Sequence, residues 1–136
     1  MKKCRLALIH TLILFSFQAT AESILKPQTQ GDVTFVSGGV GVDERNEMQA
    51  IRAEYNLSVL FSVQGTGEYL SEVKVSIADS KGNTLLETVS DGPMLLAKLK
   101  PGRYNINAEL EGQIAQKKAN VEGNKRTSIS FISPQQ

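Results

Sequence analysis

Apolar and polar residues alternate along most of the second half of the chain, which is the pattern of β-strands with one buried face. The clearest run follows Pro101-Gly102, and one of its faces would carry Tyr104, Ile106, Ala108 and Leu110. Proline presets the backbone angle φ of the second turn position and glycine accepts the positive φ of the third, so this pair predicts a tight turn. We therefore expect one strand up to residue 99 and another over residues 103–110.

Shorter alternating runs lie before and after this pair of strands. They predict strands at about residues 33–36, 57–64, 72–77, 84–90, 113–121 and 126–132. Clusters of Gly, Asp, Asn and Pro separate the runs roughly every eight to twelve residues, which is the spacing of turns in β-sandwiches. The predicted fold is therefore all-β, a β-sandwich of seven or eight strands.

One segment ahead of these strands follows a helical period instead. Met48, Ile51 and Tyr55 recur at the spacing that places apolar side chains on one stripe of a helix. Asp43 is expected to cap the helix, and Glu44 would lie in its first turn. We predict one short N-terminal α-helix over residues 44–55.

The first residues of the chain have the features of a secretory signal peptide. A basic head precedes an apolar run at residues 6–17, and Ala19-Thr20-Ala21 is a small-x-small cleavage site. We expect cleavage after Ala21 and export to the bacterial periplasm. The apolar run is too short to span a bilayer, so no membrane span is expected. In this prediction residues 1–21 are the signal peptide, residues 22–31 a flexible lead-in and residues 32–133 the sandwich domain.

Loss of the signal peptide would change the chemistry of the chain. The only cysteine, Cys4, and the only histidine, His10, lie within it, and the chain has no tryptophan. The remaining chain has 12 basic and 14 acidic residues, a net charge of about −2. Nucleic-acid-binding proteins depend on a concentrated positive field, which such a chain lacks. No nucleic-acid partner is expected.

Two motifs of the alternating segment recur in a known family. One is a strand that leads into a turn with Asp and Gly, and the other is a Leu-x-Pro-Gly turn followed by a tyrosine. The residues concerned are Val73, Val75, Ile77, Asp79 and Gly82, then Leu99, Pro101, Gly102, Tyr104, Ile106 and Ala108. Residues 57–131 thereby resemble the carboxypeptidase regulatory-like domain, which implies a transthyretin-like (prealbumin-like) β-sandwich of the small periplasmic single-domain type. Tyr104 resembles the tyrosine of a tyrosine corner, which is buried and donates its hydroxyl hydrogen to the backbone.

The same fold includes transthyretin-related hydroxyisourate hydrolases, which rely on histidines, an arginine and a C-terminal Tyr-Arg-Gly-Ser. The mature chain would have no histidine, and the sequence ends in Ile132-Ser133-Pro134-Gln135-Gln136. Mechanisms that pair serine or cysteine with histidine, and the usual zinc or copper ligands, are then missing. We expect a protein that is not an enzyme, with no metal and no cofactor. The alternative left open is a hydrolase that uses carboxylates alone, with Asp43, Glu44, Asp79 and Asp91 as candidates.

A glycine-rich segment before the helix is the main candidate binding site. Gly38, Gly39 and Gly41 precede Asp43 and Glu44, whose carboxylates would repel an anion from the positive end of the helix. The segment is either a flexible turn or a contact for a small ligand or a partner.

Tyr69 is the aromatic side chain that the sequence best places at the surface, where it could contact a ligand. The other interpretation is that its ring is packed in a loop.

These observations favour an exported, non-enzymatic module that binds or supports another periplasmic protein or a small ligand. The alternative is a structural or assembly protein that offers an exposed edge strand to another chain.

Overall fold

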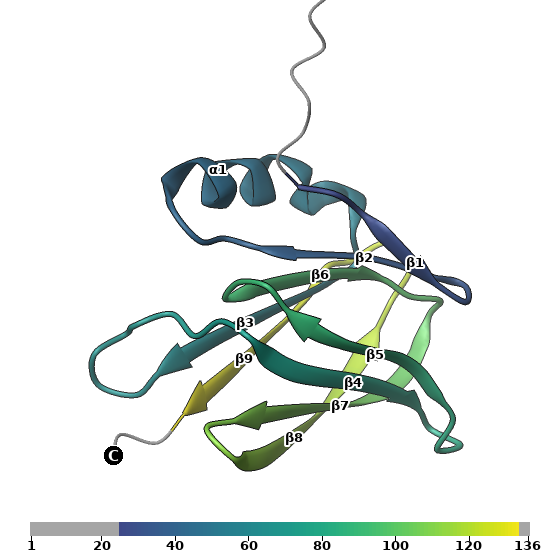
Figure 1. The fold of residues 1–136 in the computed structure, drawn as a ribbon. Coiled ribbons are helices and arrows are strands. Elements are labelled where there is room, and N and C mark those ends of the chain that lie inside the picture. Colours follow the sequence, from purple (N-terminus) through teal and green to yellow (C-terminus); the bar gives the residue numbers. More distant parts are fainter. Residues whose placement is uncertain (1–24, 134–136) are drawn as a thin grey trace, which may run out of the picture.

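The computed structural model describes residues 25–133, which form two β-sheets packed face to face with one helix outside them (Figure 1). The predicted signal peptide, its cleavage site and the first residues of the lead-in lie outside the described residues. The prediction of an all-β sandwich with one short helix near its start is confirmed.

The larger sheet has five strands, and all of its pairings are antiparallel except the parallel pairing of β3 with β9. Its strands, in spatial order, are β1 (Gln28–Gln30), β2 (Val33–Gly38), β6 (Met94–Lys98), β3 (Leu57–Val63) and β9 (Thr127–Ser133).

The smaller sheet has four strands and is antiparallel throughout. Its strands, in spatial order, are β5 (Thr84–Ser90), β4 (Val73–Asp79), β7 (Gly102–Leu110) and β8 (Gln113–Val121).

The main core lies between the two sheets and is built by the alternation seen in the sequence. On β7 the apolar residues predicted to share a face are all buried, and the polar residues between them are not. Phe61 of β3 and Phe131 of β9 stack with ring centroids 5.9 Å apart in the same core. Each large apolar side chain that is fully buried contributes about 1.5–3 kcal/mol, so this layer is the main source of stability.

The helix α1 (Val42–Ile51) continues as a 3-10 turn, η1 (Arg52–Glu54), and packs on the outer face of the five-stranded sheet (Figure 1). Met48 and Tyr55 contact a second buried cluster there with Val36 and Leu96. Strand β6 therefore has apolar neighbours on both faces, which explains why Met94, Leu95, Leu96 and Ala97 are all buried. Met48 and Ile51 lie on the predicted apolar stripe of the helix, whereas Tyr55, predicted as its last member, follows η1 in extended backbone and reaches the same cluster from there.

Three details of the predictions need correction. The ninth strand, β1, lies within the expected flexible lead-in, where it pairs with β2. Gly38 belongs to β2 rather than to the loop. The helix begins at Val42 with Gly41 as its N-cap and has no side-chain cap, so Asp43 lies in the first turn instead of capping it. A carboxylate in the first turn still interacts favourably with the helix dipole.

Candidate binding surfaces

The first glycine of the predicted site serves packing. A Cβ added to Gly38 would lie 2.6 Å from Cδ2 of Leu25 and 2.7 Å from Oε1 of Glu44, so the ends of both side chains would have to shift to admit it. A Cβ on Gly92, in the turn between β5 and β6, would collide with the backbone carbonyl of Gly38. These glycines allow two backbone segments to approach closely.

The loop from Gly39 to Gly41 is bound by side chains of the helix that follows it. Glu44 accepts a hydrogen bond from the Gly39 N–H at 3.3 Å, and Arg45 donates one from Nη1 to the Gly39 carbonyl at 3.5 Å. Gly39 and Gly41 have φ values of +100° and +83°, which favour glycine. Because Glu44 and Arg45 occupy the polar groups of Gly39, the loop does not form a cradle for an anion.

Tyr69 lies in the loop between β3 and β4, and its side chain is 54% exposed, so the surface interpretation is correct. The loop is held in place by an antiparallel bridge between Ser62 and Tyr69 and by a hydrogen bond from the Leu70 N–H to the Phe61 carbonyl. The guanidinium carbon of Arg45 lies 5.9 Å from the centroid of the Tyr69 ring, within the range of a cation–π contact.

Arg45 therefore joins the glycine loop to the loop that carries Tyr69. Two further apolar side chains of this region are exposed, Val40 at 55% and Val42 at 62%. We call Val40, Val42, Arg45 and Tyr69 the helix-start patch. Sequence analysis missed Arg45, because no local pattern links residues 24 positions apart; a cation–π contact is visible only in the folded chain.

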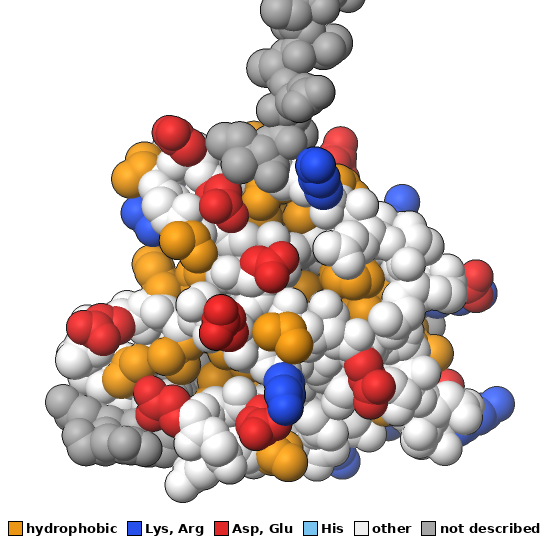
Figure 2. All heavy atoms as spheres, in the orientation of Figure 1, with side chains coloured by type: hydrophobic (Ala, Val, Ile, Leu, Met, Phe, Trp, Pro, Cys, Tyr) orange, Lys and Arg blue, Asp and Glu red, His pale blue; other side chains and the backbone are white. Residues whose placement is uncertain are grey.

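Acidic residues surround the helix-start patch. Arg45 is the only basic residue in segments 39–47, 64–72 and 91–93, which also contain six acidic residues. These are Asp43, Glu44, Glu47, Glu68, Glu72 and Asp91. Acidic side chains predominate on the left of the molecule in Figure 2, the side where α1 begins. The patch is therefore apolar and aromatic at its centre and negative at its rim.

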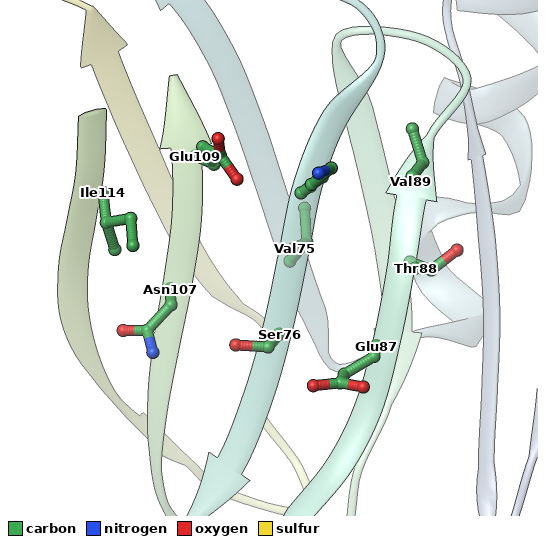
Figure 3. Close-up of a pocket in the computed structure, with 9 residues that line it drawn as sticks. Val75, Ser76, Glu87, Thr88, Val89, Asn107, Glu109 and Ile114 are labelled. Carbon is green, nitrogen blue, oxygen red and sulfur yellow. The ribbon is translucent and has the colours of Figure 1, made fainter. Parts of the chain in front are cut away.

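A second candidate surface is the outer face of the four-stranded sheet, where a hollow of about 440 Å³ lies across the strands (Figure 3). Its lining comes from all four strands and includes Lys74, Ser76, Glu87, Val89, Asn107, Glu109 and Ile114. The carboxylates of Glu87 and Glu109, the amide of Asn107 and the hydroxyl of Ser76 lie on one open face. Such a surface can offer hydrogen bonds to a polar ligand, but it has no aromatic ring on which a sugar could stack.

The four candidate carboxylates of the hydrolase alternative do not come together. Asp79 lies at the end of β4 where the β4–β5 turn begins, whereas Asp43, Glu44 and Asp91 lie at the opposite end of the sandwich. Asp79 accepts hydrogen bonds from the backbone N–H groups of Lys81 and Asn83 at 3.0 and 2.9 Å. The Asn83 backbone bond is the main reason that the pKa of Asp79 is lowered. Its carboxylate thus holds the turn that the sequence predicted.

Tyr104 has the position implied by the tyrosine-corner resemblance. Its ring is buried and its hydroxyl donates a hydrogen bond to the Lys100 carbonyl at 2.5 Å. Burial raises the pKa of Tyr104, with a smaller contribution from the charge of Asp79. The role of Tyr104 is structural.

Within residues 25–133, no cluster of three or more Asp, Glu, His or Cys residues is arranged to bind a metal ion. In the same part of the chain, no helix is both long and apolar enough to cross a membrane.

No protein-family model matches the chain, and no curated protein matches it either. Among solved structures, the chain is similar to 5-hydroxyisourate hydrolase from Klebsiella pneumoniae, with 23% sequence identity and a TM-score of 0.47. The similarity covers 57% of this chain and 88% of the other chain.

The expectation that the protein is not an enzyme is corrected by this comparison, because the similar chain is an enzyme. The expectation depends on the absence of histidine and cysteine after residue 21, which excludes particular mechanisms rather than catalysis in general. The similarity concerns the fold, and it assigns no reaction to the residues of this chain.

Proposed function

We propose that the chain is an exported carboxypeptidase regulatory-like module of the periplasm, which binds another protein through the helix-start patch. The observation that carries this proposal is the exposed ring of Tyr69, which lies beneath the guanidinium of Arg45. This contact joins the loop that carries Tyr69 to the glycine loop, and both loops are held in place. Tyrosine and arginine are enriched among the residues that dominate binding energy at protein interfaces.

The geometry supports a preformed contact surface. Hydrogen bonds to Gly39 hold one loop, and the bridge at Ser62 holds the other, so little ordering would be required on binding. The acidic rim favours a partner with an apolar centre and lysine or arginine residues around it. In this proposal the glycines position the loops, and the side chains of neighbouring residues contact the partner.

Site-specific photocrosslinking in intact cells tests this proposal. A photoreactive residue at position 42 or 69 of the full-length chain should give a discrete adduct with one partner. The matched control is position 89 on β5, where Val89 is also exposed, at 47%. Position 89 lies beside the hollow of the four-stranded sheet, so an adduct found only there would instead favour a ligand or partner on that face.

Charge reversal at Arg45 provides a second test within the same experiment. Arg45→Glu should reduce the adduct formed from position 42 about tenfold, since it removes the cation above Tyr69 and the donor to Gly39. Circular dichroism and thermal unfolding of the purified variant check that the fold is retained. Equal adducts from positions 42, 69 and 89, unaffected by Arg45→Glu, would contradict the proposal.

Export is tested separately by mass spectrometry of the protein recovered from the periplasmic fraction. The expected mature chain begins at Glu22. Recovery of the uncleaved chain from the cytoplasm would contradict this part of the proposal while leaving the binding surface open to the crosslinking test.

A further inference from the structure

The two sheets described here end in four edge strands, and three of these have features that hinder pairing with another strand. Strand β1 is only three residues long. Strand β5 is capped by Gln30, whose side-chain amide accepts a hydrogen bond from the Glu87 N–H and donates one to the Glu87 carbonyl, at 2.8 and 3.2 Å. Strand β8 carries Lys117 and Lys118. Short length, covered backbone and lysine residues are common protections of sheet edges.

Strand β9 is the fourth edge, and its composition offers none of these protections. Its sequence, from Thr127 to Ser133, contains no charged residue, proline or glycine over seven residues. Its only strand partner within the described residues is β3, in parallel register from Leu57 with Thr127 to Val63 with Ser133. It is therefore a long, uncharged edge.

The open side of β9 exposes a regular set of backbone groups. The Thr127 N–H donates to the Asn56 carbonyl and the Ser133 carbonyl accepts from the Gln64 N–H, both at 2.8 Å. Because alternate residues of a strand present their backbone groups to the same side, residues 127, 129, 131 and 133 face β3. The N–H and C=O groups of Ser128, Ser130 and Ile132 then point to the open side.

Three side chains of β9 bond to other segments: Ser128 Oγ accepts from Arg52, Thr127 Oγ1 donates to the Asn120 carbonyl and Ser133 Oγ donates to Glu111. A further contact reaches a backbone group on the open side itself. Lys117 reaches from β8 and donates a hydrogen bond from Nζ to the Ser130 carbonyl at 2.5 Å, with Nζ 5.7 Å from the centroid of the Phe131 ring. Lys117 is exposed and flexible, so an N–H group of an incoming strand could replace it at the Ser130 carbonyl. The displaced ammonium would then lie beside the new strand.

This charge distinguishes between possible occupants. A second copy that paired through β9 about a two-fold axis near Ser130 would bring both Lys117 ammonium groups close to that axis, where like charges repel. An extended segment of another protein with an acidic residue facing Lys117 would instead gain an ion pair. We propose that β9 is a docking strand for an extended, uncharged to acidic segment of a partner protein, which pairs with Ser128, Ser130 and Ile132.

This docking strand is a different surface from the helix-start patch, so each proposal can fail without the other. The test uses the mature chain and a short peptide in which threonine and valine alternate around one central glutamate. Hydrogen exchange measured by NMR should slow about tenfold at the amides of Ser128, Ser130 and Ile132 when the peptide is added. The same peptide with lysine in place of glutamate should bind about tenfold more weakly.

Two substitutions locate the site. Ile132→Glu places a negative charge on the edge strand that repels the glutamate of the peptide, so it should weaken binding of this peptide about tenfold. The matched control is Val89→Glu, which adds the same charge on β5 at a comparably exposed position, 47% against 55%, and should leave binding unchanged. Lys117→Glu should reverse the preference, so that the lysine peptide binds more tightly than the glutamate peptide.

Several results would overturn the proposal. One is a rate of hydrogen exchange at the amides of Ser128, Ser130 and Ile132 that does not change when the peptide is added at millimolar concentration. Others are equal binding of the two peptides or an equal loss of binding in Ile132→Glu and Val89→Glu. Exchange that slows with protein concentration in the absence of peptide would show that a second copy occupies β9, contrary to the charge argument.

Discussion

The outer faces of the two sheets differ in what covers them. The face of the five-stranded sheet lies under α1 and η1, where Met48, Tyr55 and Leu96 form a second buried cluster. The face of the four-stranded sheet has no such cover in the described part of the chain, and polar residues such as Ser76 and Asn107 line it (Figure 3). Both sheets contribute to the same inner core.

Residues on the covered face and on the open face should therefore contribute differently to the stability of the fold. A strand that is covered on both faces, such as β6, needs apolar residues at successive positions. A sheet face that is open to water can instead carry polar side chains that contribute little to folding. We therefore expect substitutions to have large effects on the covered face and on the inner core, and small effects on the open face. The following four predictions test this expectation in order of decreasing effect.

Truncation of the helix contact should have the largest effect. Met48 of α1 is completely buried against the five-stranded sheet, so Met48→Ala should lower the free energy of unfolding by about 2–5 kcal/mol. Urea denaturation measures the change. Gln49→Ala, at the next and exposed position of the helix, is the control and should change stability by less than about 0.5 kcal/mol. Equal effects of the two substitutions would mean that the helix does not cover a core.

Removal of the Tyr104 hydroxyl tests the turn that connects the sheets. Tyr104→Phe keeps the ring but loses the hydrogen bond to the Lys100 carbonyl, so it should cost about 1 kcal/mol at neutral pH. The pKa of Tyr104 is raised by burial, so its contribution is fully present below the ordinary tyrosine pKa of 10.0 and is lost as the pH rises through the folded-state pKa.

Urea denaturation between neutral pH and pH 11 measures this effect. Stability of the wild-type chain should fall above about pH 10, and this loss should be smaller in Tyr104→Phe. A loss that is identical in the two proteins would assign the titration to another group.

The carboxylate of the β4–β5 turn should produce a smaller, acid-dependent effect. The backbone bond from Asn83 lowers the pKa of Asp79, so the stabilising contribution is present above the ordinary pKa of 3.8 and is lost as the pH falls through the folded-state pKa. Asp79→Asn should therefore lose less stability than the wild type between pH 5 and acid conditions. Parallel acid-dependence of the two proteins would show that Asp79 does not contribute.

Substitution on the open face should have the smallest effect. Asn107 lines the hollow on the outer side of β7, so Asn107→Ala should change the free energy of unfolding by no more than about 0.5 kcal/mol. Its neighbour Ile106 points into the core, and Ile106→Ala should cost about 2–5 kcal/mol. A large loss of stability in Asn107→Ala would contradict the expectation that side chains on the open face contribute little to folding.

Sequence analysis predicted much of the fold because the information was local. Strand β8 matches its predicted bounds, residues 113–121, and the inward residues of β7 follow from their alternation. The turn at Pro101-Gly102 and the hydroxyl bond of Tyr104 also depend on neighbouring residues. Strand β1 was missed because three polar residues carry no periodic signal; only their pairing with β2 makes them a strand.

The candidate site was predicted only in part, because its members come from distant segments. The glycines before α1 and the carboxylates of its first turn form a recognisable run in the sequence. The hydrogen bonds that Glu44 and Arg45 make to Gly39 depend on where these side chains point in the fold. Tyr69 could be identified as a surface candidate, whereas its contact with Arg45 could not.

The sequence by itself determined which residues alternate, where turns interrupt them and which side chains are available for chemistry. Tertiary structure alone determined which sheet face α1 covers, which side chains meet at the helix-start patch and which strand is left as the open, uncharged edge. The physical reason is the range of the interactions. Periodicity and turn preference act between neighbours in the chain, whereas coverage and edge position depend on packing between residues far apart in sequence, such as Met48 with Leu96 or Lys117 with Ser130.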